Sequence, residues 1–573
     1  MGRRRVALGI ALCLLVAVPL AWSLYRQREL LALVDAPPAL SFQVENAREL
    51  YDRFLASQSF QSLQTSSPYL AFWDTDQGRM LETVRHGLSV VLRDDPIDLL
   101  LQAIGRRAHG ALWIRPTGGQ AVALIALPEE GTDVADLAKR LALLSKTNKR
   151  IVVKKVEDFS ALDLGGNTLL LGNGVVTIAS STSMALRIAR EWNAALGSDP
   201  PGYGHLELRI DPHAAHLAPT GGADGLGGLL SLIVAGGVAS ALGASHEVVG
   251  RVAPLPGGLR LEAHVDAGLR AMDERTRRIY APATFAPGPA APGEILRAQI
   301  ARDLDLLWED RHRVTPETLE GLGKIESLLQ TPSLFRDLFT GLEPGLTIVA
   351  APQSFDDPDW PAPESPFPGL ALTVRLKDPE QLGPRLTAAF ESVVQLANEK
   401  PADIHQPPLL VDDLVGSHGV MGARARFVAP PAGGPRIPET LRNLTPSIGH
   451  RDGVLALATS SSLVRDLLSH EAPPPIEGTA RDTLHVDAQR AANALQAART
   501  ALVQSDVEKG RPLAEAESNI DTLLAILGTL DSLDAELAYG DDDTRLSIEL
   551  RERSHGEPAA AAAGARPAGS TDR

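Results

Sequence analysis

The hydrophobic pattern opens with an uncharged run from Val6 to Tyr25, VALGIALCLLVAVPLAWSLY. A helix of about 20 residues matches the roughly 30 Å hydrocarbon layer of a bilayer. Three arginines precede the run, and such positive flanks favour the cytoplasmic side. The pattern predicts an uncleaved transmembrane helix with the remaining chain outside the cytoplasm. A cleavable signal peptide, cut near Ala21 and Ser23, is the alternative.

The rest of the chain shows one succession of patterns twice. An apolar strand, a hydroxyl-rich stretch and an amphipathic helix follow one another in GVVTIASSTSMALRIAR from Gly174 and in GVLALATSSSLVRDLLS from Gly453. Hydroxyl side chains can accept hydrogen bonds from the free N–H groups at a helix start. We therefore expect the serines of both copies to cap the helices that follow them.

Four further pairs of segments recur in the same order. They are GALWIRP with GLTIVAAP, DVADLAKRLALL with DPEQLGPRLTAAF, HLELRID with TLHVDAQ, and VVGRVAPLPGGLRLEAHV with LDAELAYGDDDTRLSIEL. Alternating apolar and polar residues joined by short turns are typical of antiparallel strands with one solvated face. The fold class predicted is α+β: an N-terminal transmembrane helix followed by two tandem related domains of mixed or antiparallel sheets with packed helices.

The duplication also sets the domain boundaries. We expect an anchor at residues 1–28, a first repeat domain at 29–270, a linker at 271–293, a second repeat domain at 294–553 and a disordered tail at 554–573. The linker is predicted from the stretch APATFAPGPAAPG, and the tail from its low complexity. A chain of 573 residues is long enough for two cores.

A second candidate span runs from Gly225 to Ser245 and carries no charge. Its counterpart in the second half, from Ile520 to Leu537, contains three aspartates and is amphipathic. Because duplicated segments are expected to pack alike, a helix buried against a sheet is favoured over a span.

Composition removes some classes of function. The net charge of −16 argues against a general nucleic-acid binder, and the basic stretch from Lys146 to Lys155 is best explained as a solvated strand and loop. Cys13 is the single cysteine, so an intrachain disulfide and a cysteine-based zinc site are excluded.

No catalytic, cofactor or metal site is predicted. A serine nucleophile would need a G-x-S-x-G turn, which surrounds none of Ser181, Ser183, Ser460 and Ser462. The histidines at 205, 213 and 216 lack the spacing of a metal site drawn from a helix, and the second half has no matching pair. The aspartates at 541–543 are expected in a hairpin turn.

Several segments together resemble a known family. These are the N-terminal run, ENARELYDRFLASQSFQSL from Glu45, IDLLLQAIGRRAHGALWI, and the two segments GVVTIASSTS and GVLALATSSS. They are similar to a family of uncharacterised bacterial envelope proteins, classed under a domain of unknown function, with an N-terminal anchor and such repeated units. The resemblance implies a cell-membrane location with an extracytoplasmic body, periplasmic where an outer membrane exists, and brings no catalytic residues.

These observations predict a membrane-anchored protein that binds or scaffolds an envelope protein or lipid and is not an enzyme. Two alternatives remain. A hydrolase of envelope polymers would hold two carboxyls with raised pKa values in one cleft. A lipid or lipoprotein carrier would show a continuous apolar groove beside the helix at Gly225 to Ser245.

Overall fold

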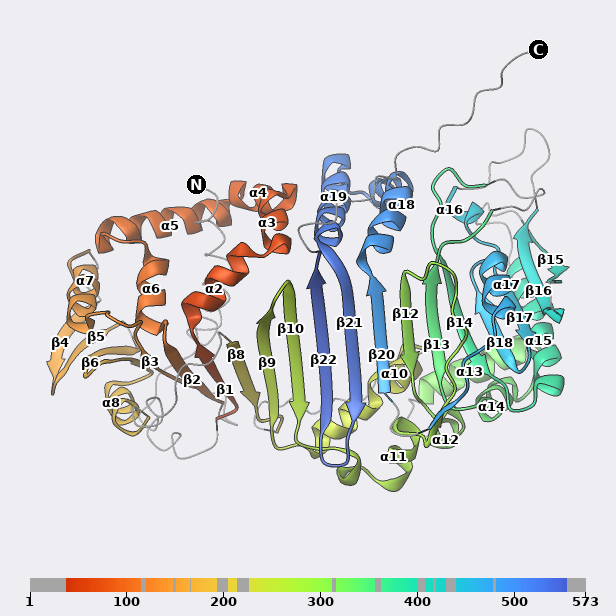
Figure 1. The fold of residues 1–573 in the computed structure, drawn as a ribbon, viewed down its shortest axis with the longest axis horizontal. Helices are drawn as coiled ribbons and strands as arrows, with labels where there is room; N and C mark the ends of the chain where they lie inside the picture. Colours follow the sequence, from red (N-terminus) through yellow and green to blue (C-terminus); the bar gives the residue numbers. More distant parts are fainter. Residues whose placement is uncertain are drawn as a thin grey trace, which may run out of the picture.

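The computed structural model describes residues 38–114, 120–147, 151–164, 166–192, 205–213, 226–311, 316–355, 362–399, 408–415, 419–428, 439–477 and 481–553. Within these residues, twenty strands form one continuous antiparallel sheet. Two short strands, β11 (Thr284–Phe285) and β19 (Ile476–Glu477), form a separate pair. Figure 1 shows the large sheet running along the length of the molecule, with the two halves of the chain at its two ends.

The first half contributes the strands of one end. They are β1 (Leu40–Glu45), β2 (Arg107–Ile114), β3 (Gln120–Leu127), β4 (Val152–Val156), β5 (Phe159–Asp163), β6 (Thr168–Gly172), β7 (Val175–Ala179), β8 (His205–Ile210), β9 (Val248–Leu255) and β10 (Gly258–Val265). The helices are α2 (Ala47–Ala56), α3 (Gln58–Thr65), α4 (Ser67–Asp74), α5 (Asp76–Leu92), α6 (Pro96–Ile104), α7 (Val134–Thr147), α8 (Thr182–Glu191) and α10 (Leu226–Ala244). From the outer edge inward, the strands lie in the order β4, β5, β6, β7, β3, β2, β1, β8, β9, β10.

The second half repeats this arrangement. Its strands are β12 (Leu296–Ile300), β13 (Leu346–Ala351), β14 (Gly369–Arg375), β15 (Leu409–Asp413), β16 (Met421–Phe427), β17 (Ser447–Arg451), β18 (Val454–Ala458), β20 (Arg481–Asp487), β21 (Leu530–Tyr539) and β22 (Thr544–Glu552). The helices are α12 (Leu304–Glu309), α13 (Pro316–Leu328), α14 (Leu334–Thr340), α15 (Pro379–Glu399), α16 (Glu439–Arg442), α17 (Ser461–Ser469), α18 (Ala488–Glu508) and α19 (Leu513–Thr529). From its own outer edge the order is β15, β16, β17, β18, β14, β13, β12, β20, β21, β22.

The two halves meet through equivalent strands, because β10 pairs antiparallel with β22. Glu262 of β10 lies directly opposite Ser547 of β22. Counted along the rows of directly opposed residues, Glu262 lies three strands away from Gln43 of β1. Ser547 likewise lies three strands away from Gln299 of β12. Two copies of one motif that pair through the same edge in this way are related by an approximate twofold axis. The sheet is therefore continuous across the two predicted repeats.

The segments matched in the sequence occupy equivalent places in the sheet. GALWIRP and GLTIVAAP lie in β2 and β13, and the two strand-plus-serine segments lie in β7 with α8 and in β18 with α17. The two amphipathic segments form α7 and α15, and the closing hairpins are β9 with β10 and β21 with β22. The described body therefore combines helices with one large antiparallel sheet.

The transmembrane part of the predicted fold class is contradicted. Among the residues that the structure describes, no helix is both long and apolar enough to cross a bilayer. The segment from Val6 to Tyr25, to which that helix was assigned, lies outside the described residues, as does the tail at 554–573. The assignments of a single-pass membrane protein and a signal anchor, which depended on that helix, are withdrawn with it.

The segment from Gly225 to Ser245 forms α10 and belongs to the body. Its Ile233 and Ala241 side chains are buried in a core shared with Val265 and Tyr539. At Gly237, an added Cβ would lie 2.4 Å from the Tyr539 hydroxyl oxygen, so the helix can approach the sheet this closely only because glycine has no side chain.

The predicted linker at 271–293 is folded. It contains the 3₁₀ turn η2 (Leu269–Ala271) at its start, α11 (Glu274–Tyr280) and β11. Ile279, Tyr280 and Phe285 are buried. Proline, alanine and glycine predicted a linker between the domains, and such residues also suit a segment that lies flat against a sheet.

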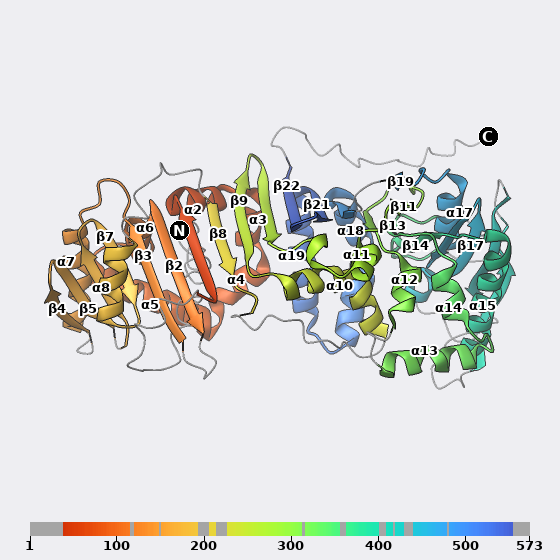
Figure 2. The same ribbon diagram turned by 90° about the horizontal axis from the view of Figure 1, so that it is seen from below.

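Helices cover the two faces of the sheet unevenly. At the outer ends, α8 and α17 pack on one face, and α7 and α15 pack on the other. Near the twofold axis, α18 contacts β21 and α10 packs near the ends of β9 and β21, and Figure 2 shows α10, α18 and α19 on one side of the central strands. The middle of the sheet thus has one polar face and one apolar face that helices border.

Candidate functional site

The apolar face of the central sheet carries two rows of directly opposed apolar residues, which we call the apolar stripe. The longer row crosses ten adjacent strands: Leu206, Val252, Leu261, Ile548, Ala535, Leu484, Ala298, Ile348, Leu372 and Leu457. The second row runs beside it: Pro254, Leu259, Leu550, Leu533, Val486, Leu296, Ala350 and Leu370. At about 4.8 Å per strand spacing, the longer row spans roughly 43 Å.

The apolar stripe is accessible along its length. Of its residues, Ala350 is buried and the others are at least partly exposed. Leu370 is 52% exposed and Leu457 is 42% exposed. Apart from Leu206, which packs on the core of the first half, no stripe residue belongs to a hydrophobic core formed by the described residues. A contiguous apolar surface that is partly exposed over this extent is typical of a binding site.

The duplication shows that this exposure is not a necessary feature of the fold. Leu124 of β3 and Ile178 of β7 are opposed to each other as Leu372 and Leu457 are. In the first half, Leu124 and Ile178 pack on a core that includes Leu101 of α6. In the second half, Leu372 and Leu457 stay exposed. One repeat has thus covered this part of the sheet with helices, while the other leaves it open.

The stripe is bounded on one side by a buried polar cluster beneath α10. The guanidinium of Arg302, which is fully buried, forms an ion pair of 2.5 Å with Asp482 of β20. Arg302 Nε also donates to the carbonyl oxygen of Ile233 in α10, at 2.7 Å. The rings of Tyr280 and Tyr539 lie 4.9 and 5.8 Å from this guanidinium. A charge buried in this way needs both the carboxylate and the carbonyl oxygens, so the cluster fixes α10 to the sheet.

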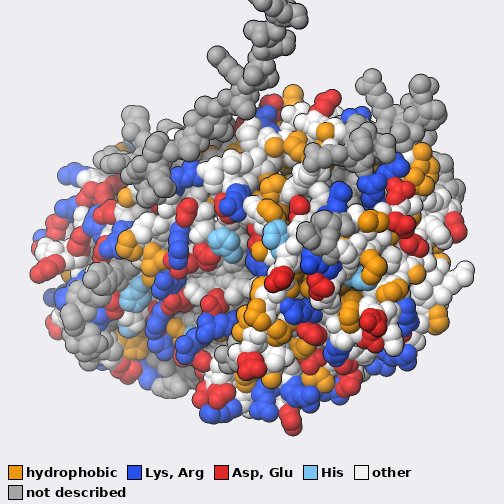
Figure 3. Space-filling model, turned by 45° about the vertical axis from the view of Figure 1, so that its right-hand side comes forward, with side chains coloured by type: hydrophobic (Ala, Val, Ile, Leu, Met, Phe, Trp, Pro, Cys, Tyr) orange, Lys and Arg blue, Asp and Glu red, His pale blue; other side chains and the backbone are white. Residues whose placement is uncertain are grey.

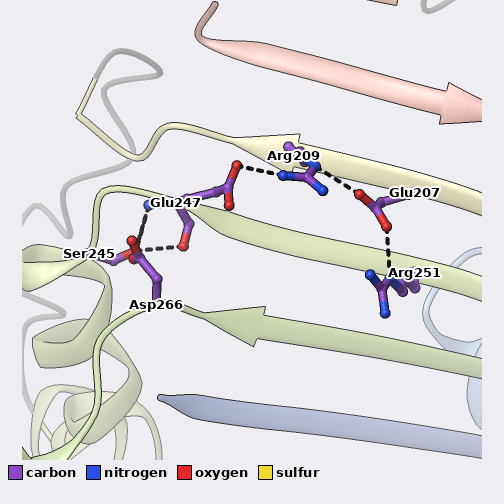
Figure 4. A network of polar contacts seen from close by, with 6 residues as sticks. All are labelled: Glu207, Arg209, Ser245, Glu247, Arg251 and Asp266. Carbon is purple, nitrogen blue, oxygen red and sulfur yellow. Dashed lines mark hydrogen bonds and ion pairs between the residues drawn. The ribbon is translucent and has the colours of Figure 1, made fainter. Parts of the chain in front are cut away.

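The opposite face of the central sheet is polar. On β8, the buried carboxylate of Glu207 accepts hydrogen bonds of 2.7 Å from Arg209 Nε and 2.8 Å from Arg251 Nε (Figure 4). Burial alone would raise the pKa of Glu207, but the hydrogen bonds from Arg251 and Arg209 outweigh it and lower that pKa. Arg209 also contacts Glu247 at 3.3 Å. This carboxylate is held charged, which does not suit a general acid.

A cavity of about 370 Å³ lies on this polar face, over β1, β2 and β8. Its lining includes Pro38, Ser41, Gln43, His109, Ala111, Trp192, Glu207 and Arg209. Beside it, the ion pair of Glu45 and Arg107, at 3.0 Å, is almost fully buried. Burial, and then the charge of Arg107, lowers the pKa of His109, so its imidazole is neutral near pH 7.

Charge on the surface is mixed in sign. Figure 3 shows acidic and basic side chains interspersed over one side of the molecule. On the polar face, His485 contacts Asp534 at 2.6 Å and Arg481 contacts Glu536 at 2.8 Å. On that side of the molecule, the described residues form no broad basic surface of the kind that binding to nucleic acids requires.

The predicted caps are right in one copy. In α8, Ser181 accepts a hydrogen bond of 3.2 Å from the Met184 N–H. In α17, Ser460 occupies the cap position without such a bond, and its hydroxyl lies 2.8 Å from that of Ser462. Ser462 instead accepts from the Ser354 N–H, at 3.0 Å, so its hydroxyl fixes a loop.

The histidines and aspartates that the sequence singled out make separate pairwise contacts. His205 lies 3.9 Å from Glu45, the ring of His213 lies 5.9 Å from that of His246, and His216 lies outside the described residues. No group of three metal-ligating side chains occurs in the described part of the chain. In the turn after β21, Asp541 and Asp542 pair with Arg270.

In the described residues, two carboxyls have a raised pKa, and they lie on separate elements. Burial raises the pKa of Asp482, although Arg302 opposes the shift, and burial also raises the pKa of Asp466. Asp482 is in β20 and Asp466 is in α17, and neither lines the cavity near His109.

Sequence patterns gave an incomplete view of this site. The alternation in LRLEAHV predicts one apolar and one polar face, and the structure has both. Whether helices cover the apolar face is decided by distant segments, and no local signal in the strands reports it.

Comparisons with known proteins leave the function open. No protein-family model and no curated protein matches the chain. Among solved structures, crystal forms IV and III of TP0453 match with a TM-score of 0.23, at 6% and 7% identity, over 40% of this chain and 77% and 76% of theirs. Crystal form I of TP0453 has a TM-score of 0.20 at 7% identity, over 40% of this chain and 76% of its own. Similarity at this level supports no argument, and the resemblance to an envelope family stays a prediction.

Proposed function

We propose that this protein is a non-enzymatic binding protein that holds an acyl chain of a lipid, or of a lipid-modified protein, on the apolar stripe. The observation that carries the proposal is the row of paired apolar residues from Leu206 to Leu457, which is partly exposed along its length and most exposed at Ile348, Leu372 and Leu457. The helix α10 lies on the same face of the sheet, where a carrier was expected to place a groove.

The shape of the stripe favours a chain over a protein domain. It is two residues wide and about nine strand spacings long, and its side chains offer no hydrogen-bond donor or acceptor. A protein interface of standard size carries about ten hydrogen bonds, which this surface does not provide. An acyl chain needs none, and each buried CH₂ contributes about 0.8 kcal/mol. Ten buried CH₂ groups would therefore contribute about 8 kcal/mol.

A direct test is the binding of a fatty acid that carries an environment-sensitive fluorophore. The full-length protein should give saturable binding with a blue shift of the emission. A variant with Ile348→Asn and Leu372→Asn, both on exposed parts of the longer row, should bind at least ten times more weakly. The loss of a few buried CH₂ contacts accounts for that factor.

Leu328→Asn provides the matched control. Leu328 of α13 is 60% exposed and lies outside the stripe, so this variant should bind like the unmodified protein. Equal affinity in all three proteins, or no saturable binding, would refute the proposal. Saturable binding of a partner helix instead of the fatty acid, lost in the stripe variant, would assign the stripe to a scaffold. The predicted location outside the cytoplasm stays a prediction.

A further inference from the structure

The cavity on the polar face of the first half has a floor built from three adjacent strands. Two rows of directly opposed residues cross β2, β1 and β8 there: His109, Gln43 and Glu207 in the first row, and Ala111, Ser41 and Arg209 in the second. All six line the cavity, together with Trp192, which follows α8. Adjacent strands lie about 4.8 Å apart, so each row is about 10 Å long. The volume of about 370 Å³ falls at the lower end of the range of about 300–1,000 Å³ that small-ligand sites occupy.

The second half shows that this cavity is not a necessary feature of the fold. Thr347 of β13 is the counterpart of His109, because each lies directly opposite the glutamine that the two halves share. In the second half, the segment 286–291 runs over the sheet, and Gly288 donates its N–H to the buried Thr347 Oγ1, at 2.9 Å. Thr347 is thus paired within the chain, and the place that forms the cavity in the first half is filled.

His109 gives the cavity a polar group that needs a partner. Its Nε2 is buried and has no hydrogen-bond partner among the described residues. A buried polar atom without a partner lowers stability, so a ligand that pairs with it is favoured. The imidazole is neutral near pH 7, because burial and the charge of Arg107 lower its pKa, so one ring nitrogen donates and the other accepts. A ligand hydroxyl can do both, so it can pair with Nε2 in either tautomer.

The charged groups beside the cavity compensate one another. Glu207 accepts hydrogen bonds from Arg209 and Arg251, and Arg209 also contacts Glu247 (Figure 4). The two carboxylates and the two guanidinium groups of this network add up to no net charge. An ionic ligand would therefore enter the cavity without a counter-charge, and an uncompensated charge in a partly enclosed site is unfavourable. The cavity suits a neutral ligand.

Trp192 gives the cavity an aromatic wall. Its ring lies 6.3 Å from the ring of Trp113, which is buried, so the indole packs on the core of the first half. An aromatic ring has an apolar surface with a negative face, against which the C–H groups of a sugar ring pack favourably. On the floor, Ser41 offers a hydroxyl and Gln43 an amide oxygen to the hydroxyls of a ligand. A neutral molecule with an apolar face and a rim of hydroxyls is a saccharide.

We propose that the cavity lined by Ser41, His109 and Trp192 binds a neutral saccharide of one or two sugar units. A ring hydroxyl pairs with His109 Nε2, and the C–H face of the sugar ring lies against Trp192. The cavity is on the face of the sheet opposite the apolar stripe. This site therefore goes beyond acyl-chain binding and does not depend on it.

Saturation-transfer NMR on the full-length protein tests the site. The probes are glucose, galactose, mannose, N-acetylglucosamine and maltose, which differ in the configuration of single hydroxyls, in one substituent or in the number of rings. At least one of them should receive saturation from the protein, most strongly at the C–H protons of one ring face, because these protons lie against Trp192. Glucuronic acid and galacturonic acid, which are negatively charged, should receive less saturation than the neutral sugar that binds best.

Three variants should locate the binding in the cavity. Trp192→Ala removes the wall and Ser41→Leu fills the floor, so each should weaken the binding of the best sugar by about tenfold or more. His109→Phe keeps an aromatic ring but removes Nε2, and the loss of one hydrogen bond should weaken binding by about threefold or more. Arg260→Ala, on the same face but outside the cavity, should leave the affinity unchanged. Circular dichroism identifies the folded variants, and one folded cavity variant suffices.

Three results would overturn the proposal. The first is an absence of saturation transfer to every neutral sugar. The second is an equal affinity of the folded cavity variants and the unmodified protein. The third is stronger binding of a uronic acid than of any neutral sugar. The peptide APGPAAP, which has the sequence of residues 286–292, serves as a competing probe. Saturation transfer to this peptide alone would assign the cavity to a polypeptide and likewise overturn the assignment to a saccharide.

Discussion

Glu262 and Ser547 hold the same position in the two halves of the chain and lie directly opposite each other on β10 and β22. An isologous dimer makes such a contact between two molecules, and here both partners belong to one chain. The pairing converts two edge strands, which would otherwise expose unpaired backbone groups, into the middle of a continuous sheet.

A disulfide should test this junction. Directly opposed residues in an antiparallel pair have Cα atoms about 4.5–5.5 Å apart, within the range of disulfides. Glu262→Cys combined with Ser547→Cys should therefore form a bond on oxidation and raise the free energy of unfolding by about 2–4 kcal/mol. Urea denaturation with and without reductant measures the gain. Glu262→Cys with Glu536→Cys, about 10 Å apart, should form no bond, and an equal yield of both would contradict the register.

Removal of the buried guanidinium of Arg302 should lower the free energy of unfolding. Arg302→Met leaves Asp482 buried without its ion-pair partner, so we expect a loss of about 3–5 kcal/mol in the free energy of unfolding. Combining it with Asp482→Leu should restore part of that loss. Arg260→Ala, which removes exposed ion pairs, should cost less than about 1 kcal/mol. Equal losses in the Arg302 and Arg260 variants would show that the cluster beneath α10 is not a structural centre.

The apolar stripe should contribute little to folding. Leu370→Gln with Leu372→Gln alters exposed side chains outside every described core, so the free energy of unfolding should change by no more than about 0.5 kcal/mol per site. Leu463→Ala, in the fully buried core beneath α17, should cost about 2–5 kcal/mol. Urea denaturation separates the two classes. A large loss in the stripe variant would mean that the stripe is part of the core.

The segment 286–291, which lies over the sheet of the second half, should tolerate no added side chain at Gly288, where it comes closest to the sheet. Gly288→Ala places a Cβ against Thr373, so the free energy of unfolding should fall by about 1–3 kcal/mol. Thr373→Ala in the same chain removes the nearest atom and should recover part of the loss. If the double variant recovers none of the lost free energy of unfolding, the contact with Thr373 is not the cause of the loss.

One buried and one partly buried histidine, His450 and His109, should make the free energy of unfolding depend on pH. Burial lowers the pKa of His450, and burial together with Arg107 lowers that of His109. Below about pH 6.5 the unfolded imidazoles bind protons that the folded ones do not, so the free energy of unfolding should fall as the pH drops. Urea denaturation at pH 7.0 and 5.5 should show this fall, and a His109→Gln, His450→Gln double variant should show a smaller one. Equal falls would contradict the assignment.

The duplication could be predicted because it consists of local patterns that recur along the sequence. An Asp-opened amphipathic helix, as in α7 and α15, and a hairpin, as in β9 with β10, depend mainly on residues close in sequence. The cap at Ser181 was predictable for the same reason. At Ser460 the hydroxyl lies beside the hydroxyl of Ser462 and does not cap the helix.

Other features were not predictable from any single segment. The residues at 271–293 were predicted to link the domains, but their sequence did not show that they also lie in a groove of the sheet. Gly288 fits this groove because Thr347 and Thr373 approach from strands far along the chain. The predicted membrane helix has no counterpart among the described residues. The charge of Arg302 beneath the apolar helix α10 likewise arises from packing between the two halves.

The sequence by itself determined the repeated order of strands and helices and the alternation that gives the central strands a polar and an apolar face, because these follow from backbone geometry and local periodicity. The tertiary structure alone decided that β10 and β22 join the repeats into one sheet, that α6 covers Leu124 while its equivalent Leu372 stays exposed, and that the groove around Thr347 is filled by the chain itself. These outcomes depend on contacts between residues that are far apart in the sequence. No local pattern indicates the free energies of such contacts.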